Sequence, residues 1–212
     1  LLEEAIGGLE DPVRSFIVAT SILPRFTVEA CGAVTNDPGA KEHLGSVEKE
    51  GLFLISLDDR QRWYRYHHLF REFMLFRLET DAPERMEALR LRASRGFEAQ
   101  DDVQEALAQA AAMKDGTQLV SLLDRHGYDI LARSEFASFA RWLPHVPDPS
   151  GQVSPMFLVA LAWYRAQTER SPDLDGLLGA LEASIEHPPD GYPGDRVREA
   201  ALHLAVLRAF VL

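Results

Sequence analysis

The fold is decided by residues 53–70, which have the sequence FLISLDDRQRWYRYHHLF. The first five of these residues are mostly apolar, residues 58–61 are polar, and residues 63–66 are rich in aromatic side chains. Two such runs joined by a short polar turn predict a β-hairpin. Apolar side chains then recur at helical spacing, so we predict a helix over residues 68–79 that places Leu69, Phe70, Phe73 and Phe76 on one buried face.

Three short helices are predicted before the hairpin. Asp11 and Pro12 suit the start of the first helix, and Pro24 stops the apolar spacing that follows them. Thr27 suits the N-cap of a second helix over residues 27–34, and Gly51 suits the end of a third over residues 40–50. Three helices, a hairpin and a further helix follow the order of a winged helix, so we predict a winged-helix domain over residues 1–80.

Beyond residue 80 the pattern is helical. A helix over residues 83–100 has Met86, Leu89, Ala93 and Phe97 in register. Further helices are predicted over residues 102–113, 116–132, 135–143, 155–169 and 172–186, and a last one from about Asp195. Helix pairs at roughly 35-residue intervals are typical of an α-solenoid, in which each pair buries its apolar face against its neighbours. We therefore predict a mainly α chain with a TPR-like helical-repeat arm over residues 81–212.

Composition excludes several classes of protein. The chain has 212 residues, 46% of them hydrophobic, which is enough to bury a sizeable core. The net charge of -11 argues against direct binding of nucleic acid, because phosphate contacts need a basic surface. No apolar run is long enough to span a bilayer, so we expect no membrane contact. Cys31 is the single cysteine and is expected to be a buried apolar residue in a cytoplasmic protein.

Motifs for catalysis are not found. None of the three lysines follows a Gly or precedes a Ser or Thr, so the chain has no P-loop and we expect no catalytic site in it. His67 and His68 are expected to point in different directions, which disfavours a metal site; the alternative is that both cap or pad the junction between strand and helix. One local basic cluster is either the solvated edge of the hairpin or a phosphate contact, and it consists of Arg60, Arg62, Arg65 and Arg71.

Three segments resemble the MalT-like regulators of the LuxR family, and they are FIVATSIL at 16–23, LFLISLDD at 52–59 and WYRYHHLF at 63–70. Similar segments follow at 92–95, 105–115 and 139–148, so the resemblance covers about residues 10–150. The resemblance implies a piece of a large signal-transduction ATPase, with a nucleotide-binding module upstream, a sensor arm and a DNA-binding domain downstream. The chain departs from the family at Gly96, where an aromatic residue is usual and where an interior glycine weakens a helix.

The resemblance also implies a site. In the wider ATPase class, a Met-His-Asp string at this place supplies a His that contacts the bound nucleoside diphosphate. Residues 66–69, with the sequence YHHL, are similar to that string, which makes His67 the candidate nucleotide-sensing residue and puts His68 in place of the Asp. Arg65 and Arg71 are candidate phosphate neighbours. ATP or ADP would be the cofactor of the full-length protein.

The expected function is that of an internal regulatory segment of such a regulator, which couples nucleotide state and the binding of a small-molecule or protein inducer to transcription. The missing initiator Met and the uncapped apolar helix at residues 205–212 agree with a piece of a longer protein, truncated in its repeat arm. The alternative is a free-standing TPR-like scaffold that binds a protein partner and no nucleotide. A P-loop sequence upstream in the gene would favour the regulator.

Overall fold

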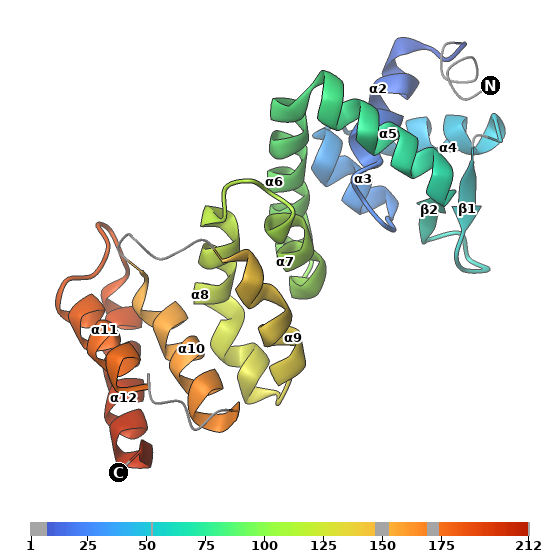
Figure 1. Cartoon of the computed structure of the whole chain (residues 1–212). Coiled ribbons are helices and arrows are strands. Elements are labelled where there is room, and N and C mark those ends of the chain that lie inside the picture. Colours follow the sequence, from blue (N-terminus) through green and yellow to red (C-terminus); the bar gives the residue numbers. More distant parts are fainter. Residues whose placement is uncertain (1–7, 52, 147–152, 169–173, 212) are drawn as a thin grey trace. The chain divides into compact units, whose positions relative to one another are not determined.

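The computed structural model describes residues 8–51, 53–146, 153–168 and 174–211. The chain forms two compact units, Leu1–Lys114 and Asp115–Leu212. Both units are built mainly of helices, and the first also contains a two-stranded sheet (Figure 1). Within the described ranges, no helix is both long and apolar enough to cross a membrane.

The first unit has the predicted order of three helices, a hairpin and a fourth helix. Its elements are α2 (Asp11–Thr20), α3 (Val28–Thr35), α4 (Ala40–Lys49), β1 (Leu54–Ser56), β2 (Tyr64–Tyr66), α5 (His68–Asp81), α6 (Pro83–Ala99) and α7 (Val103–Ala111). The predicted N-cap is confirmed, because the Thr27 side chain accepts a hydrogen bond from the Ala30 amide at 3.3 Å. Gly51 follows α4 with a φ of +63°, which a glycine adopts without strain.

The hairpin pairs β1 with β2 in antiparallel register, with Leu54 opposite Tyr66. A further bridge, which the spacing of residues did not predict, joins Phe26 to Tyr64 through two backbone hydrogen bonds of 2.8 and 2.9 Å. Side chains alternate between the faces of a strand, so Tyr64 and Tyr66 are buried while Arg65 lies on the opposite face. The hairpin is thereby held to the segment between α2 and α3.

The predicted buried face of α5 is wrong in part. Helix α5 buries Phe70, Met74 and Leu78, which follow one another at intervals of four residues. Leu69 and Phe76 are 58% and 67% exposed. They are seven residues apart and therefore lie on one face of the helix, which is not the face that packs on the core. Of the predicted residues only Phe70 lies on the buried face, where it packs on the core together with Met74 and Leu78.

Helix α6 confirms the predicted register, since Met86, Leu89, Ala93 and Phe97 are all buried. It packs against α3 and α7. Gly96 lies where α6 meets α3, and a Cβ atom there would be only 2.7 Å from the Cβ of Ala33. The glycine allows a close approach of two helices, so an aromatic residue at this position would require α3 to move.

We therefore expect Gly96→Ala to destabilise the first unit, although alanine is the better helix former. The gain in helix propensity is about 1 kcal/mol, whereas overpacking costs about 1–3 kcal/mol. The double variant Ala33→Gly/Gly96→Ala should recover most of the loss, because it removes the methyl group that alanine would meet. Urea unfolding measures both variants. A gain in unfolding free energy for Gly96→Ala alone would contradict the close approach.

The second unit contains only helices in its described part. Its elements are α8 (Thr117–Ala132), α9 (Phe136–Trp142), a short 3-10 turn η1 (Leu143–His145), α10 (Pro155–Thr168), α11 (Leu174–Glu186) and α12 (Gly194–Val211). Helix α10 lies at its centre, in contact with α8, α11 and α12. The predicted helix limits at Glu169 and Pro172, and the similar residues Pro147 and Asp148, lie outside the described residues.

Along the chain, the boundary between the two compact units lies between Lys114 and Asp115. The predicted domain boundary, between residues 80 and 81, is earlier. The reason is that the first helical pair, α6 and α7, packs within the first unit through the contact of α6 with α3. The limit of the winged helix as a domain stays a prediction.

Candidate functional site

The predicted site lies at the junction between β2 and α5. His67 is the N-cap residue of α5, but its side chain makes no capping hydrogen bond. Its backbone amide donates to the carbonyl of Phe53 at 2.6 Å, and its carbonyl accepts from the Arg71 amide at 3.0 Å. These two bonds fix the main chain of His67 to the hairpin on one side and to the helix on the other.

Neighbouring residues make this junction rigid. Tyr66 is buried, and its hydroxyl forms a 2.8 Å hydrogen bond with the Thr20 hydroxyl. Burial raises the pKa of Tyr66 above its ordinary value, so the phenol stays protonated. Phe53 has a φ of +52°, a conformation that bulky side chains rarely adopt. A strained residue persists only where the surrounding contacts hold it in place. The contacts around Phe53 therefore also fix its carbonyl, which accepts the hydrogen bond from the His67 amide.

The two histidine rings lie side by side, with centroids 4.5 Å apart and planes inclined by 34°. The expectation that they point in different directions is wrong, because the two rings lie in contact with each other. His67 is half-buried and His68 is exposed. No group of three His, Cys, Asp or Glu residues suited to a metal ion occurs within the described part of the chain.

The four arginines of the basic cluster have different surroundings. Arg71 points inward, where its Nε and Nη2 atoms donate to the carbonyls of Leu23 and Ile22 at 3.1 Å. Burial, and then the nearby Arg90 charge, lower the pKa of the Arg71 guanidinium from its ordinary value. Arg71 is therefore not part of a solvated hairpin edge, because it binds the backbone after α2.

The other arginines remain on the hairpin. Arg65 is half-buried on β2, opposite Ile55, and Arg60 is exposed in the turn. Arg62 is paired with Asp58 at 3.2 Å. Asp58 also accepts from the backbone amides of Arg62 and Trp63, and these bonds lower its pKa, the Trp63 amide most. Asp58 therefore organises the turn.

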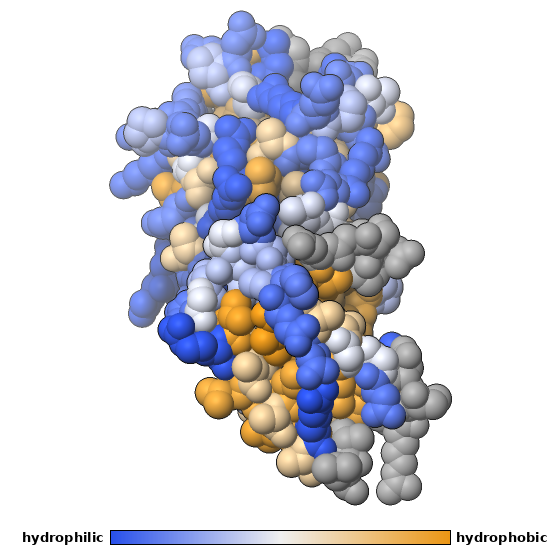
Figure 2. Space-filling view, turned by 90° about the vertical axis from the view of Figure 1, so that its left-hand side faces the viewer, coloured by the Kyte–Doolittle hydropathy of each residue, from blue (hydrophilic) through white to orange (hydrophobic). Residues whose placement is uncertain are grey.

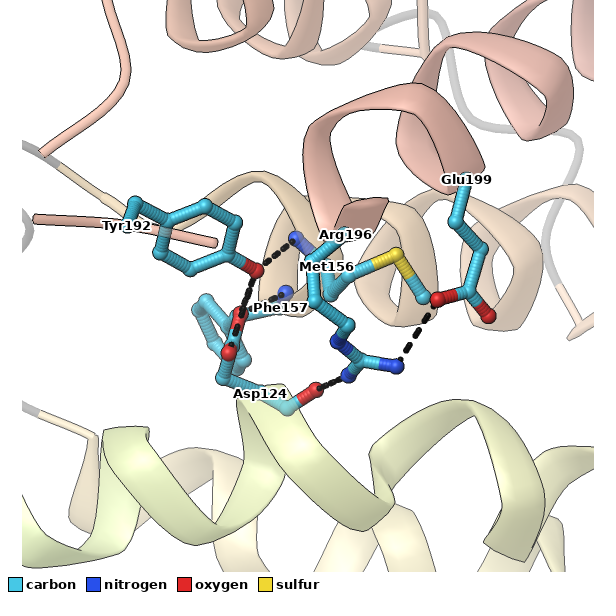
Figure 3. Close-up of polar contacts among 6 residues, drawn as sticks. All are labelled: Asp124, Met156, Phe157, Tyr192, Arg196 and Glu199. Atoms are coloured by element: carbon cyan, nitrogen blue, oxygen red, sulfur yellow. Dashed lines mark hydrogen bonds and ion pairs between the residues drawn. The ribbon is translucent and has the colours of Figure 1, made fainter. Parts of the chain in front are cut away.

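A second polar site, missed in the sequence, lies inside the second unit (Figure 3). The Asp124 carboxylate on α8 accepts hydrogen bonds from the Phe157 amide at 3.1 Å and from the Tyr192 hydroxyl at 2.9 Å. The Tyr192 hydroxyl also accepts from the Met156 amide at 3.4 Å. Arg196 on α12 donates to the Asp124 carbonyl at 2.7 Å. We call these contacts the Asp124 clamp.

The Asp124 clamp caps the first turn of α10. Met156 and Phe157 lie in that turn, where backbone amides have no partner within the helix. Ser154 precedes the helix in the position of a capping residue, yet its buried hydroxyl has no hydrogen-bond partner. A negative charge near a helix N-terminus is favourable, so Asp124 supplies both the acceptor and the charge. Burial and the Asp124 charge raise the pKa of Tyr192 above its ordinary value.

A pocket of about 560 Å³ adjoins the Asp124 clamp. Asp124, Tyr192 and Arg196 line one part of it. Its other lining residues include Thr117, Ser121, Arg125, Ser154 and Asp190, which carry polar groups, and Val120, Pro189 and Pro193, which are apolar. A concave, mostly apolar surface of this size that carries a few hydrogen-bonding groups is typical of a small-molecule site.

An aromatic group joins three helices of the same unit. The Trp163 indole N–H on α10 donates to Nδ1 of His203 on α12 at 3.2 Å, and the Tyr128 ring on α8 lies 4.3 Å from the His203 ring. Burial lowers the pKa of His203 from its ordinary value; the Glu199 charge opposes this and the Arg196 charge adds to it. The neutral imidazole is the form that accepts this hydrogen bond.

This geometry predicts that the second unit loses stability in mild acid. The unfolded chain binds a proton at His203 from about pH 6.5 downward, whereas the folded chain binds it only at lower pH, so unfolding becomes easier as the pH falls between the two pKa values. We expect the unfolding midpoint, followed by Trp fluorescence, to fall over this window and to fall less in His203→Gln. An equal fall in both proteins would exclude His203 as the cause.

Three helices, the hairpin and α5 define the first part of the chain as a winged helix. Residues 2–86 match the family model described as the MalT winged helix domain. The chain is also 24% identical, over 190 residues, to the HTH-type transcriptional regulator MalT of Cronobacter sakazakii (strain ATCC BAA-894). This similarity covers 90% of the chain and 21% of that relative, so the chain spans about a fifth of the relative's length.

Residues 2–86 are therefore a MalT-type winged helix domain, and the similarity to a MalT regulator continues beyond this domain over the helices that follow. The resemblance found in the sequence is confirmed. A match that begins in a winged helix and continues over the helical pairs does not favour a free-standing scaffold.

Proposed function

We propose that this chain is a regulatory segment of a MalT-like transcriptional regulator of the cytoplasm, in which it couples the nucleotide state of an upstream module and the binding of an inducer to transcription. The observation that supports the nucleotide role most is the position of His67. Its backbone is fixed between hairpin and helix, and the first amides of α5 are left without a side-chain cap. Such amides favour an anion such as a phosphate.

Arg65 is the better of the two candidate phosphate neighbours. It lies two residues before His67 on the face of β2 opposite the buried tyrosines. Arg71 already donates to two backbone carbonyls, which favours a structural role for it. In this proposal Arg65 assists His67, and Arg71 holds the end of α2 against α5.

The pocket beside the Asp124 clamp supports a small-molecule inducer. The clamp joins α8, α10 and the segment around Tyr192, so a ligand that displaced one of its members would change how these elements pack. A ligand can shift a conformational equilibrium only through such differential contacts.

Exposed apolar residues on α12 support a repeat arm that is extended by further helices. Leu202, Val206 and Phe210 recur every four residues and are 54% to 70% exposed. Figure 2 shows apolar surface gathered around these C-terminal helices. In a solenoid such a face is buried by the next helical pair, so we propose that a later segment of the regulator covers it.

The test of the nucleotide role is the affinity of the longer regulator for ADP. We expect His67→Ala to weaken ADP binding about tenfold, which corresponds to roughly 1.4 kcal/mol. His68→Ala is the matched control and should weaken it less. If ADP affinity is unchanged in His67→Ala while the melting temperature falls, His67 is a packing residue of the junction.

A further inference from the structure

A second pocket, of about 210 Å³, lies within the first unit between α2, α6 and the segment that joins α3 to α4. Its walls carry Arg85 and Arg92, which are seven residues apart and hence on one face of α6. Its apolar lining consists mainly of Phe16, Ala19 and Leu89. The proposed nucleotide contact at His67 involves none of these residues.

The arginines of this pocket have more N–H donors than the other lining residues use. Both oxygens of Asp37, the only carboxylate among the lining residues, are engaged: Oδ1 accepts from the Gly39 amide at 2.7 Å, and Oδ2 lies 3.1 Å from Nε2 of His43. Arg85 donates one hydrogen bond, from Nη2 to the Ser15 hydroxyl at 2.9 Å. Arg92 makes no hydrogen bond or ion pair with any residue that the structure describes.

Each guanidinium offers five N–H donors in a planar fork that fits an oxyanion. Most of the donors of Arg85 and all of those of Arg92 are thus available to a ligand. This concentration of free positive charge stands out in a chain of net charge -11. The imidazole of His43 lies against Phe16, with ring centroids 5.7 Å apart, and so forms a firm side wall.

From these observations we propose that this pocket binds a small organic phosphate monoester. Two guanidinium groups match the charge of a phosphate monoester, about -1.5 to -2 at pH 7, better than that of a monocarboxylate. The apolar lining of Phe16, Ala19 and Leu89 suits a small carbon body attached to the phosphate. The volume is small for a drug-sized molecule, which limits the carbon body to about the size of a single ring.

Calorimetry of the whole chain at constant ionic strength tests this site with three probes: phenyl phosphate, inorganic phosphate and benzoate. We expect phenyl phosphate to bind most tightly and benzoate most weakly. Arg92→Gln should weaken binding of phenyl phosphate by about tenfold or more, and Arg85→Gln should act in the same direction. Arg95→Gln is the matched control, because it removes the same charge from the same helix outside the pocket.

Three results would overturn the proposal. The first is an absence of phenyl phosphate binding at millimolar concentration by a chain whose melting curve shows it folded. The second is an equal loss of affinity in Arg95→Gln and Arg92→Gln, which would mean general attraction to positive charge. The third is benzoate binding as tight as that of phenyl phosphate, which would mean that the pocket does not recognise the phosphate group.

Discussion

We expect Phe70→Ala to lower the unfolding free energy of the first unit by about 3–5 kcal/mol, the usual cost of removing a buried aromatic ring. Phe70 is 1% exposed on α5. Its ring stacks on Phe53, with centroids 4.9 Å apart, and lies 5.5 Å from the ring of Tyr66. Phe53 accepts the hydrogen bond from the His67 amide, and Tyr66 directly precedes His67. The loss of the Phe70 ring should therefore also loosen the junction.

Phe76→Ala is the matched control for this variant. Phe76 lies on the same helix but is 67% exposed, so its removal should change stability by no more than about 0.5 kcal/mol. Urea unfolding with a probe in the first unit measures both. Equal losses in the two variants would show that α5 packs through its other face.

The second large effect is expected in the other unit, where Asp124→Ala should cost about 2–4 kcal/mol, because it leaves the Phe157 amide and the Tyr192 hydroxyl without their acceptor. The loss of a negative charge at the first turn of α10 adds to this cost. Hydrogen exchange at the amides of residues 156–160 should accelerate most, since they belong to the turn that the clamp caps.

Two milder variants separate the contributions to the Asp124 clamp. Tyr192→Phe removes one hydrogen bond and keeps the carboxylate, so it should cost about 1 kcal/mol. Asp124→Asn keeps an acceptor and removes the charge, so its cost should lie between those of the other two. If Asp124→Ala is no worse than Tyr192→Phe, Asp124 is not the residue that caps α10.

The helices could be predicted well because their signals are local. Thr27 marks a helix start that the structure confirms, and the helix predicted over residues 40–50 is α4 (Ala40–Lys49). The period of apolar residues likewise identified the buried face of α6. On α5 the same reasoning failed, because apolar residues occur on more than one face and spacing alone does not say which face meets the core.

The contacts that could not be predicted join residues far apart in the chain. Ser154 and Pro155 correctly marked the start of α10, but the cap comes from Asp124 and Tyr192, more than 30 residues away on either side. Arg71 reaches carbonyls 48 and 49 residues earlier. No spacing rule within a helix or hairpin reports such partners, since only the packing of the elements brings them together.

At the candidate site, too, the local features could be predicted from the sequence and the contacts between residues could not. The position of His67 at the junction of strand and helix could be predicted, because the hairpin and the start of α5 have strong local signals. The hydrogen bond from its amide to Phe53 and the ring contact with His68 depend on the path of the chain between strand and helix. Its role in nucleotide sensing stays a proposal that depends on the longer regulator.

The most direct test of that role is transcription without inducer, measured for the longer regulator carrying His67→Ala beside His68→Ala. Loss of a contact made only in the resting, diphosphate-bound state shifts the balance toward the active state, and roughly 1.4 kcal/mol shifts it tenfold. We predict that His67→Ala raises inducer-independent transcription by up to about tenfold, that His68→Ala raises it less, and that the melting temperature of this chain is unchanged. Unchanged basal transcription together with a lower melting temperature would contradict the account.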